Sequence, residues 1–486
     1  MRLRGLLLTW LLAACAAAPS PPAATALPTP TPFPPAAASP TPTPTVVESA
    51  TPPTAPPAPA VRTRYQLQAV LDYAAHRLDV NQQIEYTNNT AQTLEEIWLV
   101  VEAPRQNAGV ELLRLESTAG PALSTSEHRI EGGLLRLPLA AALPPGEALS
   151  LALEYRLYLP QGAGMLSWAE RQTNFIDWYP YVPPYIEGQG WVAHPPAATG
   201  EHGVYESADF DVHLRVVNGP STLSVAAPAP AVAEDGGWRY RLQNARRFAW
   251  SASGHYLRLQ TRQGDIPISI YYYAEFRDAA QAALLAAADA LRLYEELFGA
   301  YPYESATIVI AGFPDGMESD GLFFLDIDYF RRYSYDRRNY LTMLTAHEIA
   351  HNWWFGQVGS DQALEPWLDE SLSIYAELLY YEAVQPNLVD WWWEFRIGRF
   401  APSGNVDSRI YDHDGFSSYV GAVYMRGAQF LHALRGQAGD EVFFAFLREY
   451  AEQGRGRLMT QHDFFAILAQ HSDADIRDLL TEYFEN

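Results

Sequence analysis

The spacing of apolar residues changes near residue 260, and this change limits the possible folds more than any other feature of the chain. Before it, segments such as YQLQAVLDY, ALSLALEYRLY and ADFDVHLRVV alternate apolar and polar residues and end at turn residues, which predicts antiparallel strands. After Gly264 one more strand, ISIYYYAEF, precedes segments with helical spacing. We therefore predict an α+β protein, with an N-terminal antiparallel β saddle or sandwich domain (62–260) and a mostly helical domain (261–486).

The aromatic segment FIDWYPYVPPYIEGQGW, residues 175–191, interrupts the predicted strands. Two interpretations of it stay open. It is either a corner of the aromatic core of the β domain or a loop that faces the helical domain. A chain of 486 residues is too long for one ordinary core, so two folded units are expected in either case.

The N-terminus has the pattern of an export signal. MRLR is basic, GLLLTWLLAA is an apolar run too short to span a membrane as an ordinary helix, and Cys15 follows. The residues Leu12 to Cys15 resemble a bacterial lipobox, in which the cysteine is lipidated; the alternative is a plain secretory signal with an incidental cysteine. We predict a signal peptide over 1–15, a membrane partner through the lipid at Cys15, and a location at the bacterial cell surface or the extracytoplasmic face of the membrane.

Residues 16–61 consist almost wholly of Ala, Pro, Thr and Ser. Such a segment has too few large apolar residues to offset the entropy of ordering, so it predicts a disordered tether. The chain has a formal net charge of −24 and a pI near 4.8, which argues against nucleic acid as a partner. Cys15 is its one cysteine, which excludes an intramolecular disulfide and a cysteine-based zinc site.

The sequence HEIAH places His347, Glu348 and His351 within one turn of a predicted helix. Residues four apart lie on one face of a helix, so both imidazoles can reach one zinc ion with Glu348 beside them. The alternative is a helix with two surface histidines. A second helix is predicted to start near Pro366 and places Glu370 nineteen residues after His351, which completes a His2Glu set for one Zn2+ per chain.

Two further elements accompany the zinc motif. GMES, which is Gly316, Met317, Glu318 and Ser319, lies shortly before it, and YMRG, from Tyr424 to Gly427, follows it, with Tyr419 five residues before Tyr424. In this order and spacing the chain resembles the gluzincin aminopeptidases of the aminopeptidase N family, which includes the leukotriene hydrolase. The resemblance covers about residues 62–486. In that family the corresponding elements read Gly-x-Met-Glu-Asn and Tyr-x-Lys-Gly.

The resemblance implies that residues 261–486 form a thermolysin-like zinc peptidase domain. It implies that His347, His351 and Glu370 bind Zn2+ and that Glu348 is the general base for a zinc-activated water that attacks the scissile carbonyl. Tyr424 would stabilise the oxyanion, with Tyr419 and Arg426 in secondary roles; the alternative for Tyr424 is a core tyrosine.

The family loop implies that Glu318 binds the α-ammonium group of the substrate, with Gly316 and Met317 as further substrate-binding residues. The expected partners are therefore peptides with a free N-terminus, from which the enzyme removes N-terminal residues. Two alternatives stay open: a gluzincin endopeptidase, in which Glu318 is incidental, and a catalytically silent surface-binding lipoprotein.

Three positions depart from the family pattern. Ser319 replaces an asparagine, Arg426 replaces a lysine, and Asp369 stands where asparagine is common. By composition the loop FPDGMESDG, residues 313–321, is a solvated acidic turn, in which Asp315 either binds cationic groups or is only a turn residue. The family often supplies a further amine-binding Gln or Glu from the β domain, and the segment at 175–191 does not reveal which residue this is.

Overall fold

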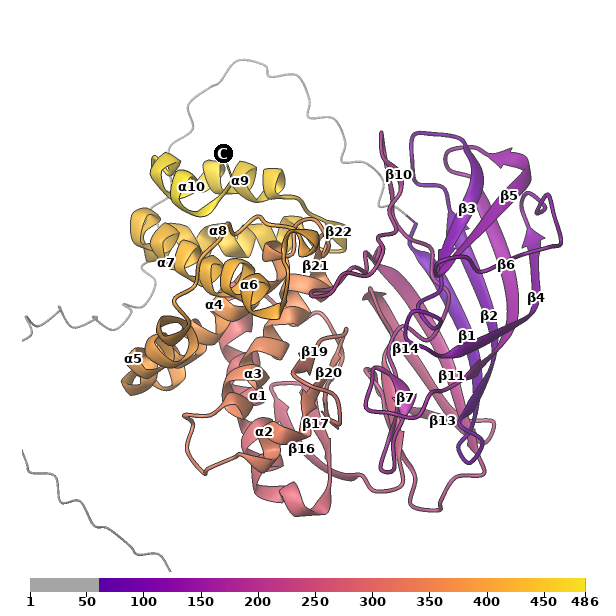
Figure 1. The fold of residues 1–486 in the computed structure, drawn as a ribbon, viewed down its shortest axis with the longest axis horizontal. Coiled ribbons are helices and arrows are strands. Elements are labelled where there is room, and N and C mark those ends of the chain that lie inside the picture. The colour runs from indigo at the N-terminus through magenta and orange to yellow at the C-terminus, as the bar shows by residue number, and fades with distance from the viewer. Residues whose placement is uncertain (1–60, 486) are drawn as a thin grey trace, which may run out of the picture. The chain divides into compact units, whose positions relative to one another are not determined.

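The computed structural model describes residues 61–485 (Figure 1). The predicted signal peptide with Cys15, and all but the last residue of the predicted tether, lie outside this range. The described residues belong to one compact unit. Among them, no helix combines the length and the apolar character that crossing a membrane requires.

The largest sheet has seven strands, and its central strands bury one face (Figure 1). Alternate residues of these strands are buried, as in β1, whose odd-numbered positions from Thr63 to Leu71 all lie in the core. In spatial order the strands are β13 (Val232–Glu234), β14 (Gly237–Ala245), β11 (Ala208–Val217), β1 (Thr63–Asp72), β2 (Arg77–Thr87), β6 (Ala148–Tyr158) and β4 (Gly109–Ala119).

One pair in this sheet departs from the antiparallel prediction. β1 and β11 run parallel, from Thr63 opposite Ala208 to Asp72 opposite Val217, and the other neighbours in the sheet are antiparallel. Parallel neighbours need a long crossover connection, and here the whole chain between β1 and β11 provides it. Alternation along each strand predicted the strands, but it carries no information about which distant strand would be the neighbour.

Smaller sheets complete the N-terminal half. They are a four-stranded sheet and two pairs: β12 (Ser224–Ala226), β15 (Trp250–Ser253), β8 (Thr173–Phe175) and β7 (Leu166–Trp168); β3 (Leu94–Val100) with β5 (Leu134–Leu143); and β9 (Tyr185–Ile186) with β10 (Gly190–Trp191). Between β8 and β9, Trp178 and Tyr179 are buried, and the Trp178 indole donates to the Phe248 carbonyl at 2.8 Å. Of the two interpretations of segment 175–191, the aromatic core describes these residues.

A five-stranded sheet precedes the helices, and its strands in spatial order are β16 (Leu257–Gln263), β17 (Ile266–Tyr272), β18 (Ala306–Ala311), β20 (Leu322–Asp326) and β19 (Gly316–Met317). β16 pairs with β17 along its whole length, so the predicted boundary at residue 260 falls inside a strand that belongs with the second half of the chain. β19 is the short edge strand formed by the GMES loop, and it pairs with Leu325 and Phe324 of β20.

Helices form most of the remaining chain. The α-helices are α1 (Arg277–Phe298), α2 (Ile327–Arg331), α3 (Tyr340–His351), α4 (Trp367–Val384), α5 (Val389–Trp392), α6 (Phe416–Tyr419), α7 (Gly427–Ala438), α8 (Asp440–Gln453), α9 (Gln461–His471) and α10 (Arg477–Tyr483). Short 3-10 turns occur at η1 (Ala274–Phe276), η3 (Pro386–Leu388), η5 (Gly398–Phe400) and η6 (Ile410–Asp412). The π-helical turns are η2 (Asn352–Gln357), η4 (Trp393–Ile397) and η7 (Val420–Arg426). The strands β21 (Val358–Gly359) and β22 (Arg457–Leu458) form a parallel pair.

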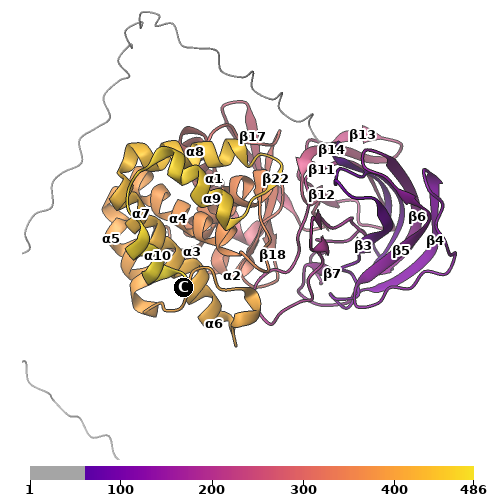
Figure 2. The ribbon, with the colours of Figure 1, turned by 90° about the horizontal axis from the view of Figure 1, so that it is seen from above.

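The helices α3 and α4 lie at the centre of the helical bundle (Figure 2). Every residue of α4 from Trp367 to Tyr381 is buried, so the helix is covered on all sides rather than amphipathic. The Tyr294 hydroxyl of α1 donates to the Ala346 carbonyl of α3 at 3.2 Å and to the Ala376 carbonyl of α4 at 2.8 Å. One phenol therefore fixes the two helices that bear the zinc motif against each other.

Candidate active site

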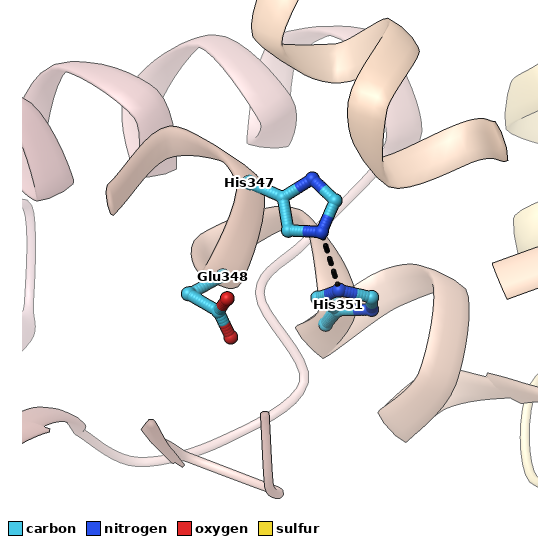
Figure 3. A group of neighbouring side chains, drawn as sticks. All are labelled: His347, Glu348 and His351. Carbon is cyan, nitrogen blue, oxygen red and sulfur yellow. Dashed lines mark hydrogen bonds between the residues drawn. The ribbon is translucent and has the colours of Figure 1, made fainter. Parts of the chain in front are cut away.

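The helix α3 places the two histidines of HEIAH side by side (Figure 3). The Asn339 side chain caps the helix by accepting from the Thr342 N–H at 2.9 Å. At the other end of the helix, the Nε2 atoms of His347 and His351 lie 3.0 Å apart. One carboxylate oxygen of Glu348 and one ring nitrogen of each histidine lie within 4.8 Å of one another, and all three side chains are buried. The helix alone therefore brings two metal-binding nitrogens and one carboxylate together.

The first turn of α4 adds Glu370 to this group. Its Oε2 lies 3.4 Å from His347 Nε2 and 3.7 Å from His351 Nε2, and it is buried without a hydrogen-bond partner in the part of the chain that is described. Ligands at zinc-bond length in a tetrahedral arrangement are separated by about 3.3 Å. The three atoms are therefore spaced as zinc ligands, and the donor set His2Glu fits a zinc ion.

Two carboxylates support the imidazoles from behind. Asp369 Oδ1 lies 2.6 Å from His351 Nδ1, and Glu377 Oε1 lies 3.1 Å from His347 Nδ1. Arg396 holds Glu377 in turn, with Nη2 at 3.0 Å from Oε1 and Nε at 3.0 Å from Oε2. A carboxylate on the far nitrogen keeps that nitrogen protonated and aims Nε2 at the metal position. Asp369, which stands where the family commonly has asparagine, therefore still provides a hydrogen-bond acceptor for His351.

The electrostatics of the group favour positive charge at the imidazoles. Burial would lower the pKa of His351, but Asp369 and Glu370 outweigh it and raise the pKa to about 10. Burial acts to raise the pKa of Glu370, yet His347, 3.4 Å away, and the charge of His351 hold it below its ordinary value. Burial also raises the pKa of Glu348 to about 8, against the opposing charges of the two histidines. A bound cation would replace protons at this point.

Tyr424 of the YMRG element approaches the same group, and Tyr419 lies next to it. The π-helical turn η7 presents Tyr424, whose ring stacks on His347 at 6.2 Å between centroids. Burial, together with the nearby charge of Glu370, raises the pKa of the Tyr424 hydroxyl well above its ordinary value. Tyr419 is buried and meets Tyr424 edge-on at 5.6 Å. The Tyr424 hydroxyl thus lies beside a predicted zinc ligand, where a donor to a developing oxyanion is needed.

Arg426 and Met317 take different places. The Arg426 Nε donates to the Gly404 carbonyl at 3.1 Å, and the guanidinium lies over the Tyr483 ring at 4.4 Å, so the structure does not bring Arg426 to the zinc group. The Met317 sulfur lies 3.9 Å from the Arg247 guanidinium. Met317 therefore belongs to the surroundings of Glu318.

The loop at 313–321 is not a solvated turn along its whole length. Glu318, Ser319 and Asp320 are only 4%, 3% and 0% exposed, so the composition-based prediction is wrong for these three residues. The Glu318 carboxylate accepts a hydrogen bond from Arg247 at 2.7 Å and a long one from the Gln362 amide at 3.5 Å. Burial raises the pKa of Glu318 to about 7, and the charge of Arg247 opposes that rise. Glu318 and Asp320 therefore lie in the protein interior, where the side chains that contact them set their pKa values.

Asp320 anchors the buried end of the loop. Its carboxylate accepts from the backbone N–H groups of Arg246 and Arg247 at 2.9 and 2.7 Å and from the Tyr303 hydroxyl at 2.5 Å. These bonds tie the loop to the segment between β14 and β15. Ser319, which replaces the family asparagine, is buried with no partner for its hydroxyl among the residues described.

The exposed start of the loop has an unusual backbone. Aligning Met317 and Glu318 with the family motif places its glycine at Asp315, and Asp315 has φ 69°, in the left-handed region that favours glycine. Its carboxylate accepts from the Tyr329 hydroxyl at 2.9 Å. Gly316 has a different role, because a Cβ there would lie 1.9 Å from Glu348 Oε1. Gly316 therefore leaves room for the Glu348 side chain.

We predict that Gly316→Ala lowers kcat by at least about tenfold, because the added methyl group displaces the Glu348 carboxylate from the position of a general base. The displaced group is the end of a side chain, so the fold should persist with little change in melting temperature. Steady-state kinetics and thermal melting test this. An unchanged kcat would contradict the prediction and show that the added methyl group does not disturb the function of Glu348.

Four residues of this region were not singled out in the sequence. Arg247, Glu201 and Gln362 carry no local pattern that marks them. The Gln362 amide lies 2.7 Å from Glu201 Oε2 and 2.9 Å from Asp369 Oδ2, and 3.5 Å from Glu318 Oε1. Glu377 did carry a signal: it lies seven residues after Glu370, two turns along the same face of α4. Glu201 is the acid that the β half supplies next to Glu318.

Comparison with known proteins places the second half of the chain in a family. The model of the peptidase family M1 domain matches residues 282–483. This chain carries a peptidase family M1 domain. The match spans both helices of the zinc group, the GMES loop, Tyr419 of α6 and Tyr424 of η7. The family expected from the four sequence elements is thereby confirmed.

The relatives of the M1 domain are distant. Aminopeptidase N of Lactococcus lactis subsp. lactis is 25% identical over 164 residues, which are 30% of this chain and 19% of that protein. Aminopeptidase M1-D of Oryza sativa subsp. japonica is 23% identical over 248 residues, which are 47% of this chain and 28% of that protein. The chain thus spans less than a third of the length of these curated relatives.

Solved structures resemble the chain over most of its length. The M1 zinc metallopeptidase from Deinococcus radiodurans superposes with a TM-score of 0.62 at 19% identity, over 86% of this chain and 93% of that chain. A mutant of that protein bound to a Tyr-Ser-Ala substrate gives a TM-score of 0.60 at 18% identity, over 87% and 95%. The likeness confirms the α+β fold, with an N-terminal β part and a helical C-terminal part.

Proposed function

We propose that this chain is a zinc-dependent aminopeptidase that removes N-terminal residues from peptides. The observation that carries the proposal is a buried carboxylate, Glu318, beside a complete His2Glu group. Gln362 links the two, since its amide lies 3.5 Å from Glu318 and 2.9 Å from Asp369, which supports His351. A fixed carboxylate at this point can bind the α-ammonium group that only a free N-terminus offers.

His347, His351 and Glu370 would hold the zinc. When bound, the ion supplies a Lewis acid that polarises the scissile carbonyl and makes water more acidic. Glu348 accepts a proton from the attacking water and transfers it to the nitrogen of the leaving amine. The Tyr424 hydroxyl donates a hydrogen bond to the oxyanion that forms on the former carbonyl oxygen. Glu318 holds the substrate's amino end, which limits cleavage to the first peptide bond.

The names of the relatives support this reading. The two curated relatives described above are called aminopeptidases, and one structural neighbour was solved with a Tyr-Ser-Ala substrate. Others of these neighbours hold L-tryptophan or L-arginine, which are amino acids with a free α-amino group. Peptides with an unblocked N-terminus are therefore the substrate class that we propose.

The test is a panel of aminoacyl p-nitroanilides, measured with and without a zinc chelator. We expect hydrolysis that the chelator abolishes and added zinc restores, and no cleavage of N-acetylated versions. Cleavage of blocked peptides at internal bonds would instead indicate an endopeptidase. No turnover of any peptide by the zinc-loaded protein would indicate a binding protein.

We also propose that a lipid on Cys15 holds the protein at the extracytoplasmic face of the membrane; support comes only from the sequence MRLRGLLLTWLLAAC. In a bacterial host fed an alkyne-bearing fatty acid, the wild-type protein should carry the label and fractionate with membranes. Labelling that persists in Cys15→Ser would contradict this.

A further inference from the structure

Arg247 lies in the segment that connects β14 to β15, and its guanidinium is buried against the GMES loop. Nη2 donates to both the carbonyl oxygen and Oε1 of Glu318, each at 2.7 Å, and Nη1 lies 3.6 Å from Asp177 Oδ2. The Arg247 and Glu318 side chains are only 4% and 5% exposed. Burial removes the solvent screening that weakens surface ion pairs, so this contact constrains both side chains.

Aromatic rings and the backbone hold Arg247 itself in place. The guanidinium lies over the Phe355 ring at 4.6 Å and the Tyr205 ring at 5.3 Å, in the range of cation–π attraction. The Arg247 backbone N–H is tied to Asp320, two residues after Glu318, at 2.7 Å. The arginine therefore contacts the loop through both its main chain and its side chain, and it has little freedom to move away.

We propose that Arg247 is a positioning residue for the amine-binding carboxylate: it fixes the rotation of the Glu318 carboxylate so that the α-ammonium group of a substrate meets an oriented acceptor. This inference rests on the proposed aminopeptidase function. A glutamate side chain alone samples several rotamers, and fixing it in advance removes that entropy cost from binding. Arg247 is thus expected to contribute to recognition of the amino group without contacting the substrate.

The charges around Glu318 explain why a buried arginine does not repel a substrate ammonium. Three acids surround the guanidinium, since Asp177 and Glu201 lie near Arg247 in addition to Glu318. Burial raises the pKa of Glu318, and the charge of Arg247 opposes this rise, so the cation favours the ionised form that an ammonium needs. Burial raises the pKa of Glu201 well above its ordinary value, and a substrate ammonium beside these three carboxyl groups would favour their ionised forms.

The neighbouring Arg246 offers a matched control. It is also buried, but its guanidinium donates only to backbone carbonyls within residues 61–485, those of Phe355, Tyr205, Gln357 and Arg457. Loss of either guanidinium should lower stability, because both leave buried acceptors without donors. Only loss of Arg247 should change the orientation of Glu318.

The experiment compares two ligands on the zinc-loaded protein by titration calorimetry. L-leucine hydroxamate and 4-methylpentanohydroxamic acid share the metal-binding group and the side chain, and only the first has an α-amino group. The ratio of their Kd values therefore reports recognition of the amine. We expect Arg247→Met to reduce this preference at least about tenfold, as loss of a well-placed charge-assisted hydrogen bond would. Arg247→Lys should restore it only in part, because an ammonium cannot reproduce the planar fork.

The controls separate this inference from the function on which it rests. The inference requires first that the wild-type protein hydrolyses aminoacyl substrates and prefers the amino ligand. It is supported if Arg247→Met loses this preference while Arg246→Met, although less stable, keeps it. An unchanged preference in Arg247→Met overturns the inference and leaves the function standing. A wild-type protein with no preference for the amino ligand contradicts the proposed amine site itself.

Discussion

Glu348→Gln should lower kcat on aminoacyl p-nitroanilides by about 10²- to 10⁴-fold, the usual contribution of a general acid–base group. The amide has nearly the same shape as the carboxylate, but it cannot accept a proton from water. The residues expected to bind zinc, His347, His351 and Glu370, are unchanged. Elemental analysis should therefore still find one zinc per chain, and steady-state kinetics should show the loss in kcat.

Glu441→Gln provides the comparison, because Glu441 is an exposed glutamate in the first turn of α8. Its substitution should leave kcat unchanged. If Glu348→Gln retained the turnover of the wild-type protein, Glu348 would not be the base. If the Glu348→Gln variant lost zinc as well as activity, Glu348 would be needed to keep the metal bound rather than to transfer a proton.

Asp320→Ala should reduce the free energy of unfolding by about 3 to 5 kcal/mol. The substitution removes the shared acceptor of two buried backbone N–H groups and the Tyr303 hydroxyl. A buried donor that loses its acceptor has no water to replace it, so each contributes to the loss. Urea denaturation followed by tryptophan fluorescence measures the change, and added zinc should be held at a fixed excess in all samples.

Two variants bracket this prediction. Asp320→Asn keeps one carbonyl oxygen and should fall between the wild-type protein and Asp320→Ala. Asp315→Asn alters an exposed acid of the same loop and keeps a residue type that tolerates positive φ, so its unfolding free energy should stay within about 0.5 kcal/mol of the wild-type value. An Asp320→Ala variant as stable as Asp315→Asn would show that the loop is not anchored at residue 320.

Helix geometry explains why part of the site could be predicted from the sequence. The relation of His347 to His351 depends only on a spacing of four residues along one helix. The α+β class follows from a change in period that is visible along the chain. These inferences depend only on local sequence and not on which distant segments are in contact.

The environment of Glu318 could not be predicted in this way. Composition predicted a solvated turn at residues 318–320, because Glu318, Ser319 and Asp320 stand together just before Gly321 and such polar clusters beside glycine are typical of turns. In the folded protein the segment after β14 covers them, and Arg247, about seventy residues earlier in the chain, becomes the partner of Glu318. Nothing in the letters ARRF indicates that one arginine would meet a carboxylate and the other only backbone.

The sequence by itself therefore determined the fold class, the two helices of the HEIAH motif and Glu370, and the family to which the domain belongs. Tertiary structure alone decided which acids are buried, which cation faces them, and that Gly316 makes room for Glu348. The physical reason is the distance along the chain over which each interaction acts. Spacing along a helix is set by local backbone geometry, whereas the charge and orientation of a buried side chain are set by whatever segment packs against it.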